Sequence, residues 1–362
     1  MSKLAKALTA AAGNVAGGYE YNYFAFPQAV ANGATYYYDN YISVADVSAR
    51  PTMSMYNYKK LDNGYFNYYM RGLAGDPENH VVFCTSSQGS KIYAVDIENS
   101  MNILWSKNVS SVKALTHDHE NQILYYITGN NTLTAVDSTD GSSLGTLSTS
   151  GLTFTPSNVF NVTLVDDNTR LVIFQSYESS ASANCLATFD VSNPASMSLD
   201  SQNAVDVYNG DQHGIGWDAE SQILWVNGYY DSSVYGLTQS GSGWVKSYTI
   251  SAGASPFGMT VAKGLDAVIV GTSGELQIWD VSNPSSPSKV YTGTGSERKY
   301  ALAFDETEKF AYGTRIPSNT SWGIGNWDLS SSISSPTFTQ LSNLGTPYTT
   351  LNQFRSYNAI VT

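Results

Sequence analysis

A short stretch, Asp118-His-Glu-Asn-Gln-Ile123, returns later in the chain as Asp218-Ala-Glu-Ser-Gln-Ile223. In each copy an Asp opens a polar turn, and an apolar strand begins five residues after it. The same spacing recurs in four further copies, the last of which lacks the leading Asp: Asp76–Val81, Asp166–Leu171, Asp305–Phe310 and Ala262–Ala267. The chain therefore contains an internal repeat, and a repeat of this kind sets the whole architecture.

A second pattern closes an apolar strand with Asp, as in Tyr93-Ala-Val-Asp96 and Gln277-Ile-Trp-Asp280. Further copies end at Asp137 and Asp190, and a degenerate copy ends near Leu237. The first and last copies, at Asp46 and Asp328, lie 282 residues apart in six steps, a mean of 47 residues. Each unit alternates apolar and polar residues between Gly, Asn or Ser turns, which indicates about four short strands per unit.

A single sheet of four short strands cannot bury both of its faces, so the units must pack face to face and close into a ring. We therefore predict an all-β fold, a β-propeller of about seven four-stranded blades. Blade seven ends near Thr337–Leu341, whereas blade one, near Thr35–Asp46, lacks an innermost strand. We expect the C-terminal strand Phe354–Thr362 to supply that strand and close the ring. The predicted division is an N-terminal anchor or docking segment, 1–30, followed by the propeller, 31–362.

Two strand ends carry a family resemblance. Phe189-Asp-Val-Ser-Asn-Pro194 and Trp279-Asp-Val-Ser-Asn-Pro284 resemble the core of LVIVD repeats, a propeller repeat of microbial surface proteins. Asp46–Pro51 and Asp328–Ser332 are weaker copies. The resemblance extends over about two-thirds of the chain on the repeat spacing. It implies a propeller and carries no catalytic residue.

The composition limits the partners. The chain has 18 Lys and Arg against 30 Asp and Glu, a net charge of −12, which argues against binding to nucleic acid or to anionic lipid. No apolar run is long enough to insert in a membrane, and the N-terminus lacks the apolar core of a signal peptide. Yet the 26 Tyr and 30 Gly residues are typical of an exposed, exported protein. These features indicate a protein made in a cytoplasm and used outside a cell.

The segment Leu4-Ala-Lys-Ala-Leu-Thr-Ala-Ala-Ala-Gly-Asn14 resembles the N-terminal segment of structural proteins of marine tailed bacteriophages. The resemblance implies a virion protein, which is released by host lysis and needs no signal peptide. A short Ala-rich helix within residues 2–13 would be marginal alone and would order on a partner. The candidate docking residues are Leu4, Leu8, Tyr19, Tyr21 and Tyr23.

Propeller ligands bind where the innermost strands enter the central channel. Counting five residues back from the first pattern predicts a ring of side chains at that rim: Arg71, Lys113, Asn161, His213, Phe257 and Tyr300, with Arg355 from the C-terminal strand. Such a ring fits an anion, a sugar or an ordered-water plug. The simpler interpretation is that these ends are polar because the channel is wet.

No catalytic residue, cofactor or metal site is predicted. His117 and His119 are the one close imidazole pair, but other copies of the turn lack His, which favours an exposed structural turn over a zinc site. No nucleophile motif accompanies a base. The Asp turns hold too few carboxylates for calcium, so we expect them to cap their own turns. Cys84 and Cys185 are expected to be buried apolar side chains.

The first functional hypothesis is a non-enzymatic virion structural protein: an exterior decoration, tail fibre or host-contact module. Its partners would be other virion proteins, bound through the N-terminal segment, and a host-surface glycan or protein; the exposed tyrosines of blade one would serve a homo-oligomer. The alternatives are a secreted or surface propeller hydrolase, similar to a lactonase, and a cellular surface adhesin. Both would place the protein outside a cell, and the fold alone does not separate the three.

Overall fold

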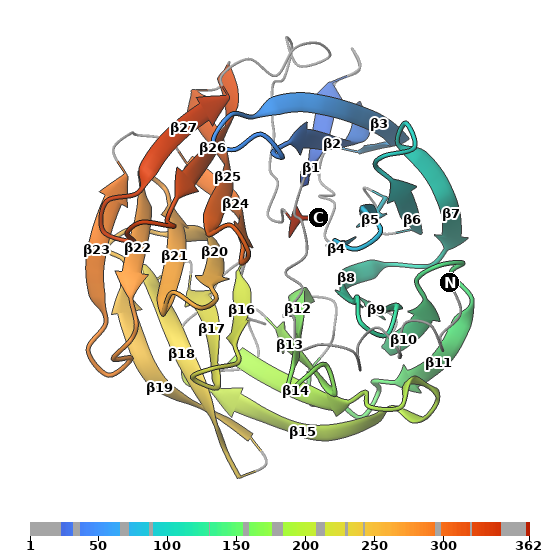
Figure 1. Cartoon of the computed structure of the whole chain (residues 1–362). Helices are drawn as coiled ribbons and strands as arrows, with labels where there is room; N and C mark the ends of the chain where they lie inside the picture. The colour runs from blue at the N-terminus through green and yellow to red at the C-terminus, as the bar shows by residue number, and fades with distance from the viewer. Residues whose placement is uncertain are drawn as a thin grey trace, which may run out of the picture.

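The computed structural model describes residues 23–31, 37–65, 72–86, 90–129, 131–154, 159–175, 184–207, 214–228, 231–241, 243–293, 298–318, 321–341 and 360–362. Over these ranges, 28 strands form seven four-stranded antiparallel sheets, arranged as the blades of a ring (Figure 1). The predicted seven-bladed propeller is confirmed. The described chain contains one short helix, the 3-10 helix η2 (Pro194–Ser196).

In blades two to seven the chain runs outward, so that the first strand of each blade is innermost and the fourth is outermost. Blades one to three consist of β28 (Ile360–Val361), β1 (Tyr23–Ala31), β2 (Tyr37–Asp46) and β3 (Ser54–Tyr65); β4 (Leu73–Asp76), β5 (Val81–Thr85), β6 (Lys91–Asp96) and β7 (Asn102–Asn108); and β8 (Val112–Asp118), β9 (Ile123–Thr128), β10 (Thr132–Asp137) and β11 (Ser143–Ser148). Blades four and five consist of β12 (Val159–Val165), β13 (Arg170–Gln175), β14 (Asn184–Asp190) and β15 (Ser198–Val205); and β16 (Ile215–Asp218), β17 (Ile223–Gly228), β18 (Ser233–Ser240) and β19 (Gly243–Ser251). Blades six and seven consist of β20 (Pro256–Ala262), β21 (Ala267–Thr272), β22 (Leu276–Asp280) and β23 (Ser288–Gly293); and β24 (Arg298–Asp305), β25 (Phe310–Ser318), β26 (Ser321–Asp328) and β27 (Thr337–Leu341).

The repeated Asp residues mark strand ends, as the spacing predicts. An Asp of the first pattern ends β4, β8, β16 and β24, and an Asp of the second pattern ends β2, β6, β10, β14, β22 and β26. The prediction is wrong at the degenerate copy, because β18 continues past Leu237 to Ser240 before a tight turn leads into β19. Without Asp to cap a turn, the hairpin extends to the next polar residues.

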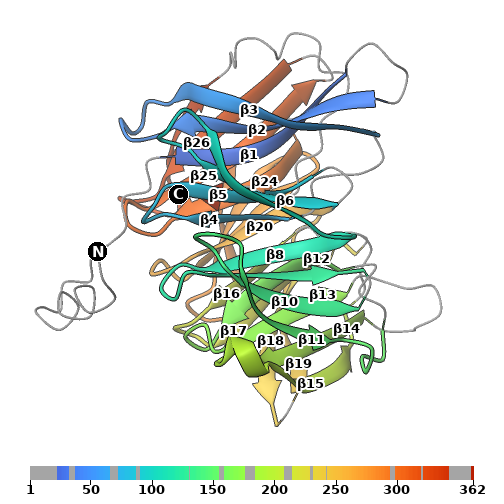
Figure 2. The same cartoon turned by 90° about the vertical axis from the view of Figure 1, so that its right-hand side faces the viewer.

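The two patterns place their turns at the same end of the ring. The connections from first to second strand and from third to fourth strand all lie there, because successive strands are antiparallel. We call this end the turn face. The C-terminus also lies on it, on the left-hand side of the propeller in Figure 2.

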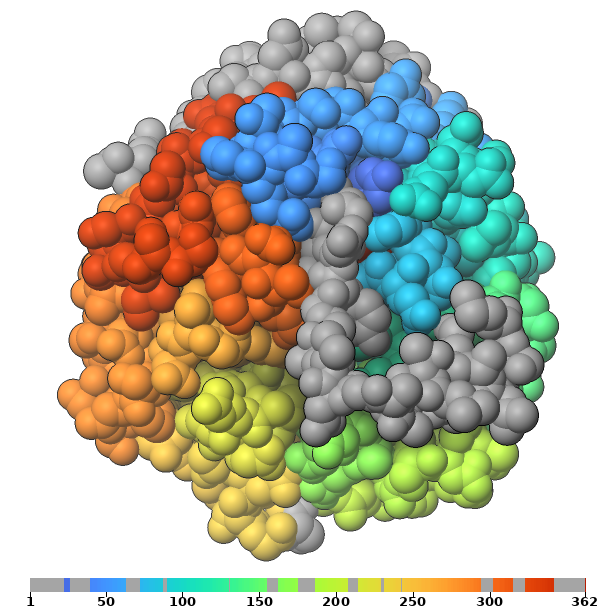
Figure 3. All heavy atoms as spheres, viewed as in Figure 1, coloured from blue at the N-terminus to red at the C-terminus, as the bar shows by residue number. Residues whose placement is uncertain are grey.

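The ring is closed by the two ends of the described chain. β28 pairs with β1, placing Val361 opposite Phe24, and the Tyr23 and Thr362 backbones exchange two hydrogen bonds of 2.9 Å. The innermost strand β28 contacts both β24 and β4, so it completes the circle of inner strands. The predicted closure by the C-terminal strand is therefore confirmed. In the space-filling view, blade one, in blue, lies against blade seven, in red (Figure 3).

The predicted domain boundary at residue 30 falls too late. β1, from Tyr23 to Ala31, is the second strand of blade one and pairs with β2 along its full length. Phe24, Ala25 and Phe26 are fully or almost fully buried. The segment 23–30 therefore belongs to the propeller, because it is a strand of blade one and its residues Phe24, Ala25 and Phe26 lie in the core.

The hydrophobic core is divided into seven clusters, one at each contact between neighbouring blades. Successive side chains of a strand point to opposite faces, so a strand with both faces covered, such as β9, serves two clusters. In β1, Phe24 and Phe26 pack against blade seven, whereas Ala25 packs against blade two. Middle strands such as β9 and β17 are consequently buried along their whole length.

Cys84 in β5 is fully buried, and burial raises the pKa of its thiol above the ordinary value. Because the thiolate is the reactive form, we expect iodoacetamide at pH 8 to leave Cys84 unmodified in the folded protein and to modify it in urea. Peptide mass spectrometry distinguishes it from Cys185, which lies in β14. Rapid labelling of Cys84 without denaturant would contradict its buried position.

Candidate functional site at the channel rim

The innermost strands place the predicted ring residues near the channel. Lys113 lies in β8, Asn161 in β12, Phe257 in β20 and Tyr300 in β24, each within the first three residues of its strand. Four positions of the ring therefore lie on innermost strands, as the repeat spacing predicts. Arg71, His213 and Arg355 lie outside the described residues. What the ring binds stays a prediction.

Each of these four strands is irregular at the ring position. The pairing register shifts between Val112 and Ala114 in β8, and between Pro256 and Gly258 in β20. Similar shifts fall between Val159 and Asn161 in β12 and between Lys299 and Leu302 in β24. A β-bulge turns a side chain away from the regular alternation and increases the local twist. The bulges therefore redirect the side chains of Lys113 and Phe257, which sequence spacing cannot show, and interrupt the backbone pairing of β12 and β24 at the same position.

Lys113 illustrates the effect. The half-buried side chain of Lys113 passes close to Gly129 of the same blade. A Cβ atom added to Gly129 would lie only 2.7 Å from Lys113 Cε and 2.8 Å from Ser111 Oγ. The Gly129 N–H also donates to the Ser111 carbonyl at 2.8 Å. Gly129 therefore makes room for the lysine at the rim. The repeat did not indicate Gly129, because this residue follows β9 and lies outside both Asp patterns.

The prediction that His117 lies in an exposed turn is wrong. His117 is the sixth residue of β8 and is 9% exposed, with Nδ1 3.0 Å from the Gly75 carbonyl and the ring 4.8 Å from that of Phe83. Burial lowers its pKa, although Asp76 opposes the effect. The strand carries His117 into the contact between blades two and three. His119 lies beyond the strand in the turn, and the described part of the chain has no group of three His, Cys, Asp or Glu side chains that could hold a metal.

The Asp turns are capped as predicted. In the first pattern, Asp76 accepts backbone N–H bonds from Glu78 and Asn79, and Asp218 accepts them from Glu220 and Ser221. The second pattern behaves similarly: Asp46, Asp137, Asp190, Asp280 and Asp328 each accept the N–H of the residue two positions later. These carboxylates therefore satisfy local backbone groups at the turns.

The outer strands of several blades contact the next blade of the ring. In blades one to three the outer strand contacts the turn between the third and fourth strands of the next blade, and in blade four it contacts the start of β19. Tyr56 Oη donates to the Glu98 carbonyl, Trp105 Nε1 donates to the Ser138 carbonyl, Gly145 touches Pro194, and Asn203 pairs with both backbone groups of Trp244. These contacts join the outer strands of blades one to four to the blade that follows each of them.

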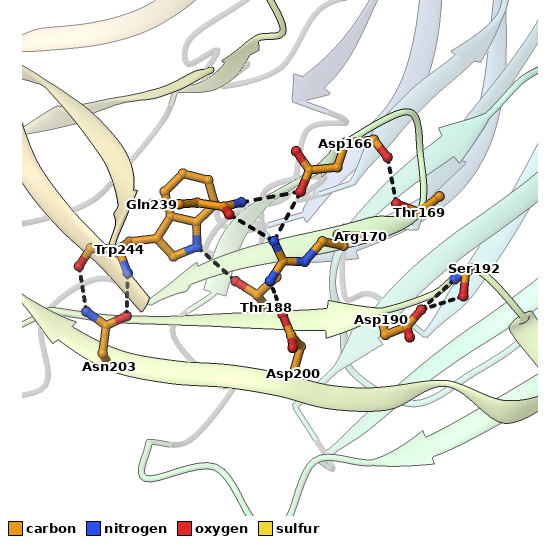
Figure 4. A network of polar contacts seen from close by, with 10 residues as sticks. All are labelled: Asp166, Thr169, Arg170, Thr188, Asp190, Ser192, Asp200, Asn203, Gln239 and Trp244. Atoms are coloured by element: carbon orange, nitrogen blue, oxygen red, sulfur yellow. Dashed lines mark hydrogen bonds and ion pairs between the residues drawn. The ribbon is translucent and has the colours of Figure 1, made fainter. Parts of the chain in front are cut away.

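The joint between blades four and five contains the polar network drawn in Figure 4. The Arg170 guanidinium binds Asp200, Asp166 Oδ2 at 3.1 Å and Gln239 Oε1 at 3.1 Å, and Gln239 lies in blade five. Sequence reasoning missed this network. The one available signal was Arg170 itself, which stands where two other copies of the turn have Gln.

Trp244 gives a testable result in the same joint. Its indole N–H donates to Thr188 Oγ1 at 2.8 Å, and both side chains are buried. Thr188→Val keeps the shape but leaves the N–H without an acceptor, so we expect the free energy of unfolding to fall by about 1–3 kcal/mol in urea titrations. The exposed Thr146 of β11 is the control, since T146V should change stability by less than about 0.5 kcal/mol. Equal effects of the two variants would contradict the assignment.

Of the candidate docking residues, Leu4, Leu8, Tyr19 and Tyr21 lie outside the described residues. Tyr23 belongs to β1, and its ring lies 5.1 Å from that of Tyr56 and 5.2 Å from that of His80. Burial, with Glu98 nearby, raises the pKa of Tyr23 to about 12. Tyr23 therefore contributes to the contact between blades one and two.

Comparison with known proteins supports the repeat. The family model described as LVIVD repeat matches residues 181–203 and 267–292, which include the two stronger copies quoted above. Both copies end in an Asp-Val-Ser-Asn-Pro turn on the turn face, where Asp190 binds Ser192 and Asp280 binds Ser282. In this chain the signature therefore has a structural role. No curated protein sequence matches the chain.

Solved structures resemble the whole fold. A protein from Lactobacillus plantarum has 12% identity and a TM-score of 0.67, covering 93% of this chain and 98% of that one. A functionally unknown protein from Desulfotomaculum acetoxidans has 12% identity and a TM-score of 0.62, covering 91% and 98%. The Cps50 (Swd1) β-propeller domain from Myceliophteria thermophila has 10% identity and a TM-score of 0.56, covering 76% and 86%. At these identities the likeness shows the fold alone.

Over the ranges that the structure describes, no helix has the length and apolar character to cross a bilayer.

Proposed function

We propose that the protein is a non-enzymatic structural protein of a virion, in which the propeller is an exterior interaction scaffold and the N-terminal segment attaches it to the particle. The scaffold role is the coarser part of this proposal, and a propeller with LVIVD repeats fits it. The virion role is supported by the resemblance of residues 4–14 to the N-terminal segment of tailed-phage structural proteins.

The observation that carries the scaffold role is the position of exposed apolar side chains. Within the described ranges, the large hydrophobic residues that remain exposed all lie on outermost strands: Tyr56, Tyr58, Ile103, Leu104, Leu144, Leu199, Val245 and Phe338. An outermost strand also has an open backbone edge, which natural proteins protect or use for contacts. Apolar side chains beside open edges around the circumference suit protein partners better than a small substrate.

The buried carboxylates support a structural role as well. Asp76, Asp118, Asp218 and Asp305 are each at most 8% exposed. Each accepts hydrogen bonds from the turn that follows it, and so each has a task in the fold. An acid or base for hydrolysis would need instead to face a substrate.

Mass spectrometry of density-gradient-purified particles from the source culture tests the proposal. Co-sedimentation with capsid and tail proteins at stoichiometric abundance is the expected result. If the protein occurs only as a free soluble species, the virion role fails, and hydrolase assays on the soluble protein become the next measurement.

Deleting residues 1–18 tests the attachment. We expect the propeller to fold, because the described fold begins at Tyr23, and incorporation into particles to be lost. The control replaces residues 1–18 with a Gly/Ser segment of equal length, which keeps the chain length and should fail to attach in the same way. Normal incorporation of the replaced chain would disprove an attachment role for this segment.

A further inference from the structure

The charges of the chain are divided unequally between the turn face and the rest. Counting from the last residue of one strand to the first of the next, the turn face carries 20 of the 30 acidic residues and 4 of the 18 basic residues, a formal charge of −16. The remainder of the chain carries 10 acidic and 14 basic residues, a formal charge of +4. The acidity of this protein is therefore a property of one end of the propeller.

Exposed carboxylates lie in the turns of most blades. These carboxylates are not among the capping Asp residues named above. They include Glu120 in blade three, Asp167 in blade four, Glu220 in blade five, Asp266 in blade six and Glu308 in blade seven. Spread over a wide surface, they produce a field that attracts a cationic partner before contact.

The turns that hold these carboxylates are well ordered by their own hydrogen bonds. Glu220 and Glu308, for example, follow Asp218 and Asp305, which accept their backbone N–H groups at 3.2 and 2.9 Å. The side chains therefore start from a fixed backbone, and a partner that binds them need not order the loop.

The attachment point of the N-terminal segment lies on the same face. Tyr23 pairs with Asp46, the last residue of β2, and with Thr362, so the preceding residues join the propeller at the turn face. A segment that attaches the protein to a particle would bring this end of the propeller to the particle surface. The acidic end and the attachment point therefore coincide.

From the charge division and this attachment point, we infer that the turn face is a docking surface for a basic protein surface, rich in Lys and Arg. The inference deepens the proposed function and rests on it in taking the partner to be a virion protein. The opposite end of the propeller, with the channel rim, then points away from the particle.

Binding to poly-L-lysine tests the charge selectivity with the purified full chain. We expect the protein to bind a poly-L-lysine surface at 50 mM NaCl and to be released as salt screens the charges. The triple variant E120Q/E220Q/E308Q removes three exposed charges from three blades and should bind about tenfold more weakly.

The control variant changes the net charge equally at another place. T146K/T249K/T292K adds three positive charges at exposed positions on the outer strands of blades three, five and six, away from the turns. If only net charge matters, it should bind as weakly as the Gln variant; if the turn face is the contact surface, it should bind clearly better than the Gln variant. Equal weakening by the two triple variants would overturn the inference, whether or not the protein belongs to a particle.

Carboxylate footprinting separates this inference from the proposed function. Carbodiimide and glycine ethyl ester should modify Glu120, Glu220 and Glu308 in the free protein and spare them on purified particles, while Asp206, whose side chain is fully exposed and lies off the turn face, reacts in both. Equal labelling of all four residues on particles would show that the turn face is free and overturn the inference alone. Absence of the protein from particles would overturn the virion role, and the poly-L-lysine result would still decide the charge selectivity.

Discussion

Replacing Arg50 with Ala is expected to lower the free energy of unfolding by about 3–5 kcal/mol. Arg50 lies in the turn after β2 of blade one, and its guanidinium binds Asp305 Oδ2 at 2.6 Å and donates to Tyr312 Oη at 2.9 Å, both in blade seven. Asp305 is fully buried. The substitution leaves that carboxylate without its countercharge at the joint that closes the ring, and urea unfolding should show it.

A second arm of this experiment varies the pH. Burial is the largest influence on the pKa of Asp305 and raises it above the ordinary value, while Arg50 lowers it. Because the folded-state pKa is raised, protonation of Asp305 favours folding, and the cost of its ionisation grows as pH rises. The penalty of R50A should therefore shrink as the pH falls from 7 toward about 4, the ordinary range of Asp.

Two controls separate this effect from a general loss of charge. In R50A/D305N the unpaired charge is gone, so stability should partly return relative to R50A. Lys263 and Glu306 form an exposed pair between blades six and seven, 3.3 Å apart, and K263A should cost less than about 1 kcal/mol. If K263A and R50A lowered the free energy of unfolding equally, the buried ion pair at the ring closure would contribute no more to stability than an exposed pair.

Gly145→Ala is expected to destabilise the protein by about 1–3 kcal/mol or more, although an added methyl group in a strand usually helps. A Cβ atom on Gly145 in β11 would lie 1.9 Å from the Pro194 carbonyl oxygen and 2.9 Å from its carbon. Both are backbone atoms of η2, whose first turn is capped by Asn193. The two backbones must therefore shift relative to each other, because the contacted atoms belong to backbone and not to a flexible side chain.

Gly151 is the matched control for this variant. It lies three residues after β11, in the connection to blade four, and a Cβ atom there would meet no atom within 4 Å. G151A should change the free energy of unfolding by less than about 0.5 kcal/mol in the same urea titration. A G145A protein as stable as G151A would show that the outer strand of blade three does not rest on the Asp-Val-Ser-Asn-Pro turn.

The strand positions of the candidate rim residues could be predicted from the sequence, but the local backbone geometry at those positions could not. Counting back from the repeated Asp residues placed Lys113, Asn161 and Tyr300 on inner strands, because these three strands are seven or eight residues long. The bulges beside them, and the Gly129 that gives way to Lys113, depend on how a strand meets its partner. His117 was misjudged for the same reason, since its burial comes from a neighbouring blade.

The sequence by itself determined those features of the fold that depend on hydrogen bonds between residues close together in the chain. Asp46 and Asp137 bind the residue two positions later, so the strand ends, the repeat, the number of blades and the closing C-terminal strand could be derived from local patterns. Only the tertiary structure decided which turns touch across blades. Arg50 meets Asp305 across 255 positions, and Gly145 meets Pro194 from the next blade. Such contacts follow from the angle between packed sheets, which no single repeat encodes.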